Sequence, residues 1–170
     1  MHTQRYDIPG TWPGRLAIMP RPRGGDCLDE EVRAWREQGI QLVLSALTKD
    51  EIEELQLGAE RDLCEANGIE YVPFPIADRG VPSSLAEMAR LARLLDKKLA
   101  SGAKIVIHCR QGIGRASLLA ACVLAATGVE PRAAFERIQA SRGCPVPDIQ
   151  EQTDWVVRFA QRQLTARSGG

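Results

Sequence analysis

The chain has 170 residues, of which 44% are hydrophobic and 26% charged, and its formal net charge is zero. This length and balance predict a single soluble domain, residues 1–170, with a core of its own. Zero net charge argues against a broad attraction to nucleic acid, and no apolar run reaches the length of a membrane span. We therefore expect neither nucleic acid nor a membrane among its partners.

Cysteine and histidine usage argues against a metal site. Only two histidines accompany five cysteines, which are Cys27, Cys64, Cys109, Cys122 and Cys144. No C-x-x-C pair occurs, so a zinc site is not expected, and neither is any cofactor. The odd count and the lack of a signal-peptide pattern predict reduced thiols in a cytoplasmic protein. We expect a monomer.

The first half of the chain predicts short strands separated by helices. Residues 1–15 are rich in Pro and Gly and predict an irregular N-terminal segment. Apolar runs predict strands at 16–19, 41–45 and 69–74. Helical composition predicts helices at 28–38 and 50–67, the second broken near Gly58. A loop containing Asp78 follows at 77–84.

The second half predicts longer helices around one strongly buried strand. Ser83 or Ser84 is expected as the N-cap of a helix that extends to about Ala100, with Glu87 placed for a capping box from Ser84. Residues 104–108 predict a buried strand and 116–126 an apolar helix. Pro131 opens a further helix, a last helix is expected at 148–165, and 166–170 reads as a flexible tail. Alternating strands and helices predict an α/β fold with a mostly parallel sheet covered on both faces.

The segment from His108 to Ser117 lies between the buried strand and the apolar helix. A loop in that position turns backbone N–H groups and a helix N-terminus toward one point, which makes an anion cradle. Cys109 in such a cradle is a candidate nucleophile toward phosphorus, and Arg115 can return to the same anion. The predicted phosphate-binding residues are Arg110, Gln111, Gly112, Ile113, Gly114 and Arg115.

His-Cys, five residues and then Arg form the signature that this chain shares with the protein tyrosine phosphatase superfamily. The wider pattern resembles its dual-specificity branch related to cyclin-dependent kinase inhibitor 3, also called kinase-associated phosphatase. That likeness covers roughly residues 15–160 and includes the stretches 39–41, 75–78, 120–122 and 142–143. The resemblance implies a compact fold with a central sheet of about five strands and helices on both faces.

The resemblance also implies roles for individual residues. Asp78, which lies 31 residues before Cys109, matches the general acid that protonates the leaving group. Read by itself, Asp78 is more simply an ordinary turn aspartate close to Gly80. His108 matches an accessory group that shapes the loop. Cys27, Cys64 and Cys144 are possible disulfide partners for Cys109 on oxidation, as some family members use, although a plain structural role is the simpler reading; Cys122 is expected in the core.

Three positions depart from the family pattern or match it only in part. The family has Ser or Thr directly after the arginine, but this chain has Ala116 and places a hydroxyl one residue later, at Ser117. That shift predicts a slow second step, because the hydroxyl assists release of the cysteine sulfur. Gln152 matches the second of two water-positioning glutamines, while the first position is Asp148. An exposed helix glutamine is the alternative reading of Gln152.

The preferred function is hydrolysis of protein phosphotyrosine, with phosphoserine and phosphothreonine as further substrates, through a phosphocysteine intermediate. One alternative is a lipid or small phosphate-ester phosphatase on the same fold, which more basic residues in the loop would favour. A second is a catalytically impaired phosphate-binding module, which Ala116 alone supports. A rhodanese-like sulfurtransferase is the last alternative, since that family has a shorter loop and no upstream acid.

Overall fold

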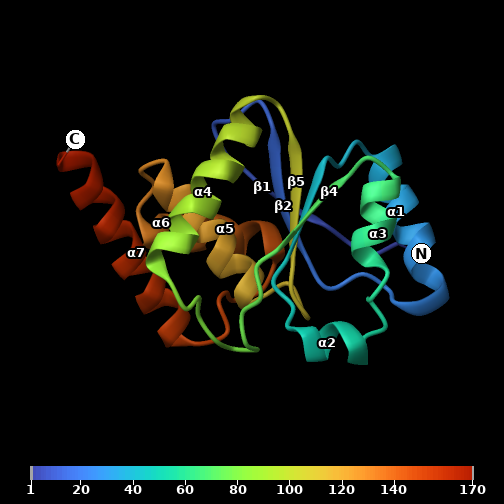
Figure 1. Cartoon of the computed structure of the whole chain (residues 1–170). Helices are drawn as coiled ribbons and strands as arrows, with labels where there is room; N and C mark the ends of the chain where they lie inside the picture. The colour runs from blue at the N-terminus through green and yellow to red at the C-terminus, as the bar shows by residue number, and fades with distance from the viewer. Residues whose placement is uncertain (1, 170) are drawn as a thin grey trace.

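In the computed structural model, which describes residues 2–169, five strands form one sheet in the order β1-β2-β5-β3-β4 (Figure 1). Their bounds are β1 Tyr6–Ile8, β2 Arg15–Met19, β3 Leu42–Ser45, β4 Glu70–Pro73 and β5 Lys104–His108. β1 is antiparallel to β2, and all other pairs are parallel. The predicted α/β fold with a mostly parallel five-stranded sheet is confirmed. Because β5 is central, the segment after it leaves the middle of the sheet.

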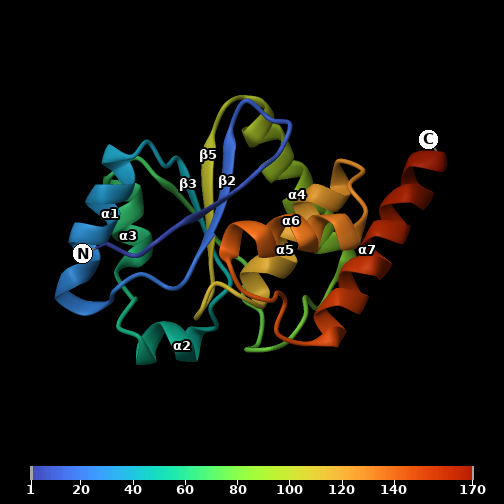
Figure 2. The same cartoon turned by 180° about the vertical axis from the view of Figure 1, so that it is seen from behind.

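Helices cover both faces of this sheet (Figures 1 and 2). One face carries α1 (Leu28–Glu37) and α3 (Glu60–Ala66), and the other carries α4 (Leu85–Ala100), α5 (Arg115–Ala126), α6 (Pro131–Arg142) and α7 (Gln150–Ser168). The short α2 (Lys49–Glu54) lies beyond the carboxyl ends of the strands, and a single 3₁₀ turn, η1 (Gly25–Cys27), precedes α1. Among the residues described, no helix combines the length and apolarity needed to cross a membrane.

The side chains of β5 divide between two apolar clusters. Ile105 and Ile107 belong to the larger cluster, on the side of α5, whereas Val106 belongs to the smaller cluster on the side of α1. Successive side chains of a strand point to opposite faces. His108 therefore faces the smaller cluster, and the chain then turns into the loop that leads to α5.

Two predictions about the ends of the chain are wrong. Residues 1–15 were expected to be irregular, but β1 pairs with β2 in the register Tyr6 to Ile18. The composition of this short segment does not favour a strand. Backbone hydrogen bonds with the neighbouring strand stabilise it instead. The tail expected at 166–170 is helical up to Ser168, because α7 continues past residue 165.

The predicted helix at 50–67 is two helices, as the break near Gly58 indicated. α2 ends at Glu54 and α3 begins at Glu60. Gln56 between them has a φ of 56°, in the left-handed region that ends helices. The expected N-cap is confirmed, since the backbone N–H of Glu87 donates to Ser84 Oγ over 3.1 Å.

Candidate active site

Cys109 begins a tight loop that ends at Gly114, the N-cap of α5. The backbone N–H of Gly112 donates to Cys109 Sγ over 3.3 Å, so the loop curls back over the sulfur. Gly112 has a φ of +68°, and a Cβ there would lie 2.5 Å from the backbone carbon of Met19. The loop can therefore approach β2 only because this residue is glycine.

Arg142, at the end of α6, holds the outer side of this loop. Its guanidinium donates to the carbonyl of Gly112 over 3.1 Å and to that of Gln111 over 3.2 Å. The same group lies 4.3 Å from the ring centroid of Tyr6, in cation–π geometry. Carbonyls held outward leave the amides of the loop free to turn toward an anion. Sequence reasoning had noted residue 142 only as part of the family likeness.

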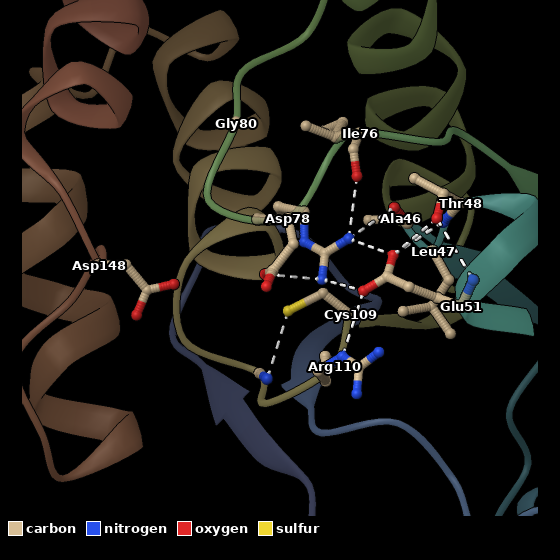
Figure 3. A network of polar contacts seen from close by, with 12 residues as sticks. Ala46, Leu47, Thr48, Glu51, Ile76, Asp78, Gly80, Cys109, Arg110 and Asp148 are labelled. Carbon is tan, nitrogen blue, oxygen red and sulfur yellow. Dashed lines mark hydrogen bonds and ion pairs between the residues drawn. The ribbon is translucent and has the colours of Figure 1, made fainter. Parts of the chain in front are cut away.

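Arg115 is 2% exposed and anchored by several acceptors at once, of which Glu51, Ile76 and Asp78 are labelled in Figure 3. Its Nη1 donates to Glu51 over 2.7 Å and to the carbonyl of Ile76 over 2.9 Å. Its Nη2 donates to Glu51 over 2.8 Å and to Asp78 over 3.1 Å. The Nε–H has no acceptor among residues 2–169. An anion in the loop would therefore accept a hydrogen bond from the Nε–H and compete with Asp78 for the hydrogen bond from Nη2.

Glu51 is a site residue that sequence reasoning missed. Thr48 and Glu51 form a capping box at the start of α2, with the Glu51 carboxylate also accepting the Thr48 backbone N–H over 3.0 Å. Burial raises the pKa of Glu51, but hydrogen bonds from Arg115 and Thr48 outweigh it and bring the pKa to about 2. The sequence signal for Glu51 was the Thr-x-x-Glu spacing. That spacing predicts the start of a helix but does not indicate that the glutamate pairs with an arginine.

Burial would lower the pKa of Arg115, but its hydrogen bonds to Glu51 and the neighbouring negative charges of Cys109 and Asp78 raise it instead. The guanidinium thus stays charged although it is buried. A charged, immobile donor set at this position suits recognition of a phosphate.

We expect Glu51→Gln to lower stability in a pH-dependent way. A carboxyl whose pKa falls from 4.5 to about 2 on folding stabilises the fold by about 3 kcal/mol above pH 4.5. That contribution disappears as the pH falls from 4.5 toward 2. Urea unfolding at pH 7 should show the gap between the two proteins, and unfolding near pH 2.5 should show it mostly closed. A gap that is constant with pH would contradict this account.

The side chain of Arg110 is paired with two carboxylates of α2. It donates to Glu54 over 2.8 Å and to Glu51 over 3.3 Å. Its carbonyl accepts the backbone N–H of Arg21 over 3.1 Å. Arg110 thus contributes to the position of the loop, and its charge is matched by two carboxylates.

The loop that carries Asp78 is tied to α7 through Gln152. Gln152 is fully buried, donates to the carbonyl of Gly80 over 3.1 Å and accepts the backbone N–H of Asp148 over 3.1 Å. The reading of Gln152 as an exposed helix glutamine is therefore wrong. Asp78 remains 59% exposed at its side chain. Arg79 has a φ of 57°, which keeps this loop in a sharp turn.

These elements enclose a cleft of about 290 Å³ above Cys109. It is lined by Asp78, Arg79, Cys109, Arg110, Gln111, Gly114, Arg115 and Asp148. In Figure 3, Asp148 extends its carboxylate toward the cleft from the side opposite to Glu51. Gly114 leaves room for it, because a Cβ there would lie 2.1 Å from Asp148 Oδ2. Within residues 2–169, no three potential ligands from His, Cys, Asp and Glu are arranged to hold a metal ion.

The remaining predicted accessory residues lie around Cys109 without lining the cleft. His108 is fully buried and contacts Glu60, with 2.7 Å between Nε2 and Oε1. Ser117 is also fully buried, and its Oγ has no hydrogen-bond partner in the described part of the chain. It therefore does not supply the hydroxyl that is missing at Ala116. All five cysteines are free thiols.

Comparison with known proteins places this geometry in a family. Residues 17–129 match the sequence model of a family described as the DSP-PTPase phosphatase of polymorphic toxin systems. The chain belongs to this DSP-PTPase family. The match spans Asp78, Cys109 and Arg115, and ends beyond the loop and α5. The suspected membership in the dual-specificity branch of the protein tyrosine phosphatases is confirmed.

Relatives within the wider superfamily agree with that assignment. The DSP-PTPase chain is 29% identical over 137 residues to cyclin-dependent kinase inhibitor 3 of Homo sapiens, covering 79% of this chain and 64% of the human protein. A crystal structure of kinase-associated phosphatase, with a serine in place of its catalytic cysteine, superposes with a TM-score of 0.88 at 21% identity. It covers 96% of this chain and 97% of that one. The active form of Tk-PTP gives a TM-score of 0.71 at 25% identity, covering 88% and 93%. The matched segment thus covers less than two thirds of the length of these curated relatives.

Proposed function

We propose that this chain hydrolyses phosphate monoesters of proteins, on phosphotyrosine and also on phosphoserine and phosphothreonine, through a phosphocysteine intermediate. The observation that carries the proposal is the convergence of Cys109, the loop amides and an anchored Arg115 on one cleft that also holds Asp78. Membership in the DSP-PTPase family supports the same reaction.

In the first step, the Cys109 thiolate attacks phosphorus and forms an S–P bond while the P–O bond to the substrate breaks. Asp78, carrying a proton, donates it to the departing oxygen. The equatorial oxygens of the phosphoryl group accept hydrogen bonds from the loop amides and from Nε–H and Nη2–H of Arg115. Binding of phosphate thus releases Asp78 from Arg115, which frees the carboxyl to reach the leaving group.

In the second step, water attacks the phosphorus of phosphocysteine and the S–P bond breaks. The Asp78 carboxylate takes the proton from that water, and inorganic phosphate and the thiolate are released. Gln152 and Asp148 are near this loop, with Gln152 holding the carbonyl of Gly80. We assign Gln152 the role of positioning the acid loop, and His108 that of supporting Cys109 from the opposite face of the sheet.

The charges around the cleft favour a protein phosphomonoester over a polyanionic lipid headgroup. Arg110, the single basic residue inside the loop, is paired with Glu51 and Glu54. Asp148 adds a negative charge to the wall of the cleft. A headgroup with several phosphates needs unpaired basic side chains, and only Arg79 offers one among the lining residues.

The test is hydrolysis of p-nitrophenyl phosphate and of phosphotyrosine and phosphothreonine peptides in EDTA. We expect metal-independent turnover that vanadate inhibits, with peptides preferred over phosphoinositide vesicles. Retained phosphate binding without turnover of any ester would reject the enzyme and favour a binding module, while preference for the vesicles would favour a lipid phosphatase.

We expect Asp78→Ala to lower kcat/KM for p-nitrophenyl phosphate by about 10²-fold or more, because kcat/KM reports the step in which the leaving group must depart without a proton. The loss should be larger for an alkyl ester, whose leaving oxygen is more basic, than for an aryl ester. Steady-state kinetics on phenyl and alkyl phosphates measure both effects. Equal losses on the two esters would contradict the assignment of Asp78 as the acid.

We expect Ala116→Ser to speed the second step by about tenfold, the value of one hydrogen bond to a charged sulfur. The original chain should show a burst of p-nitrophenol followed by slower turnover, and the variant a smaller burst and a faster steady state. Rapid-mixing kinetics measure both phases. An unchanged steady-state rate would mean that the missing hydroxyl does not limit turnover.

A further inference from the structure

Glu60 and His108 form a buried polar pair directly behind the candidate nucleophile. Their side chains are 1% and 0% exposed, and 2.7 Å separates Glu60 Oε1 from His108 Nε2. Glu60 is the first residue of α3, and His108 is the last residue of β5, immediately before Cys109. The pair lies on the opposite face of the sheet from α5.

The surroundings of this pair offer it little other support. Glu60 Oε2 and His108 Nδ1 have no hydrogen-bond partner among residues 2–169. Burial and the charge of Glu60 raise the pKa of Cys64 to about 12, and they do the same for Tyr71. Both neighbours therefore stay protonated and neutral. Within residues 2–169, His108 is the one side chain that hydrogen-bonds the buried carboxylate.

Stability of the fold does not explain why this pair is there. A buried, incompletely bonded polar pair is often no more stabilising than apolar residues of the same size. The flanking residues Leu57, Cys64 and Val106 are apolar core, so an apolar pair would fit the same cluster. The pair is better explained by its position next to Cys109.

The link from His108 to Cys109 is short and stiff. The His108 carbonyl accepts the backbone N–H of Ala46 over 2.9 Å, which fixes the backbone at the end of β5. The contact with Glu60 fixes the side chain of the same residue. With both ends held, the peptide that follows has little freedom, and it sets the direction of the Cys109 sulfur.

We propose that Glu60 is a positioning residue for the phosphatase reaction: its carboxylate accepts Nε2–H of His108 and thereby holds Cys109 in line for attack on phosphorus. This inference rests on the proposed function. It predicts a larger effect on kcat than on phosphate binding, because phosphate is held by the loop amides and Arg115, which Glu60 does not contact.

The test compares Glu60→Leu, which removes the acceptor, with Glu60→Gln, whose amide oxygen can still accept Nε2–H. We expect Glu60→Leu to lower kcat for p-nitrophenyl phosphate by about 10- to 100-fold, the scale of a small misplacement of a reacting group. The inhibition constant of inorganic phosphate should stay within about threefold of that of the original chain. Glu60→Gln should restore most of kcat.

The matched control is Glu31→Leu. Glu31 is also a fully buried carboxylate, but its partners are Thr3 and Arg23, away from the cleft. It should keep kcat. If Glu60→Leu does not fold, Glu60→Asp replaces it in the test. Aspartate keeps the charge, but its side chain is one methylene shorter, so the carboxylate is farther from His108 and kcat should fall as well.

A second measurement needs no substrate. The rate of Cys109 alkylation by iodoacetamide, followed by mass spectrometry, should fall in Glu60→Leu and recover in Glu60→Gln. A chain without turnover would reject the proposed function, and the alkylation rates would still decide the role of Glu60. Unchanged kcat and alkylation in Glu60→Leu, or a loss in Glu60→Gln or Glu31→Leu as large as in Glu60→Leu, would overturn the proposal.

Discussion

Cys109→Ser is expected to lower turnover of p-nitrophenyl phosphate by about 10⁴-fold or more, because a serine hydroxyl stays protonated near neutral pH and is a far weaker nucleophile than a thiolate. Cys109 is 3% exposed and its sulfur accepts the N–H of Gly112, an environment that suits an anion. The loop amides and Arg115 are unchanged in the variant. Phosphate and vanadate should therefore still bind, which isothermal titration measures.

Cys27→Ser is the matched control for that experiment, since Cys27 is a half-buried thiol of η1 outside the cleft. It should retain full turnover. Turnover that survives in Cys109→Ser but is lost in Cys27→Ser would mean that Cys109 is not the nucleophile and that another thiol is. Loss of both turnover and phosphate binding in Cys109→Ser would instead indicate a collapsed loop.

Arg115→Lys is expected to lower kcat/KM by about 10³-fold or more, a typical loss for an arginine that stabilises phosphoryl transfer. Lysine keeps the charge and can still pair with Glu51, but it cannot supply Nε–H and Nη2–H as a planar fork. The affinity for phosphate should fall with kcat. Steady-state kinetics and the inhibition constant of phosphate measure the two effects.

Arg132→Lys is the control here, because the side chain of Arg132 is 90% exposed and pairs with Glu136 on the same helix, away from the cleft. It should leave both constants unchanged. Full activity in Arg115→Lys would mean that a point charge suffices, and the bidentate contact with phosphate would have to be abandoned.

The sequence alone determined the central chemistry because the loop is local. His108, Cys109 and Arg115 lie within one turn between a strand and a helix, so the spacing itself predicts that they share an anion. The strand at 104–108, the N-cap at Ser84 and the helix that Pro131 opens are likewise set by neighbouring residues. Family membership and the α/β fold followed from the same short-range signals.

Only the tertiary structure decided what holds that loop in place. Glu51 reads as a capping residue and Arg142 as the end of a helix, yet one anchors Arg115 and the other the loop carbonyls. Gln152 could be judged buried only once α7 was packed against the loop of Asp78. β1 needed the edge of β2 to form. These contacts join residues far apart in the chain, and side-chain type and spacing carry no information about which distant element will lie opposite them.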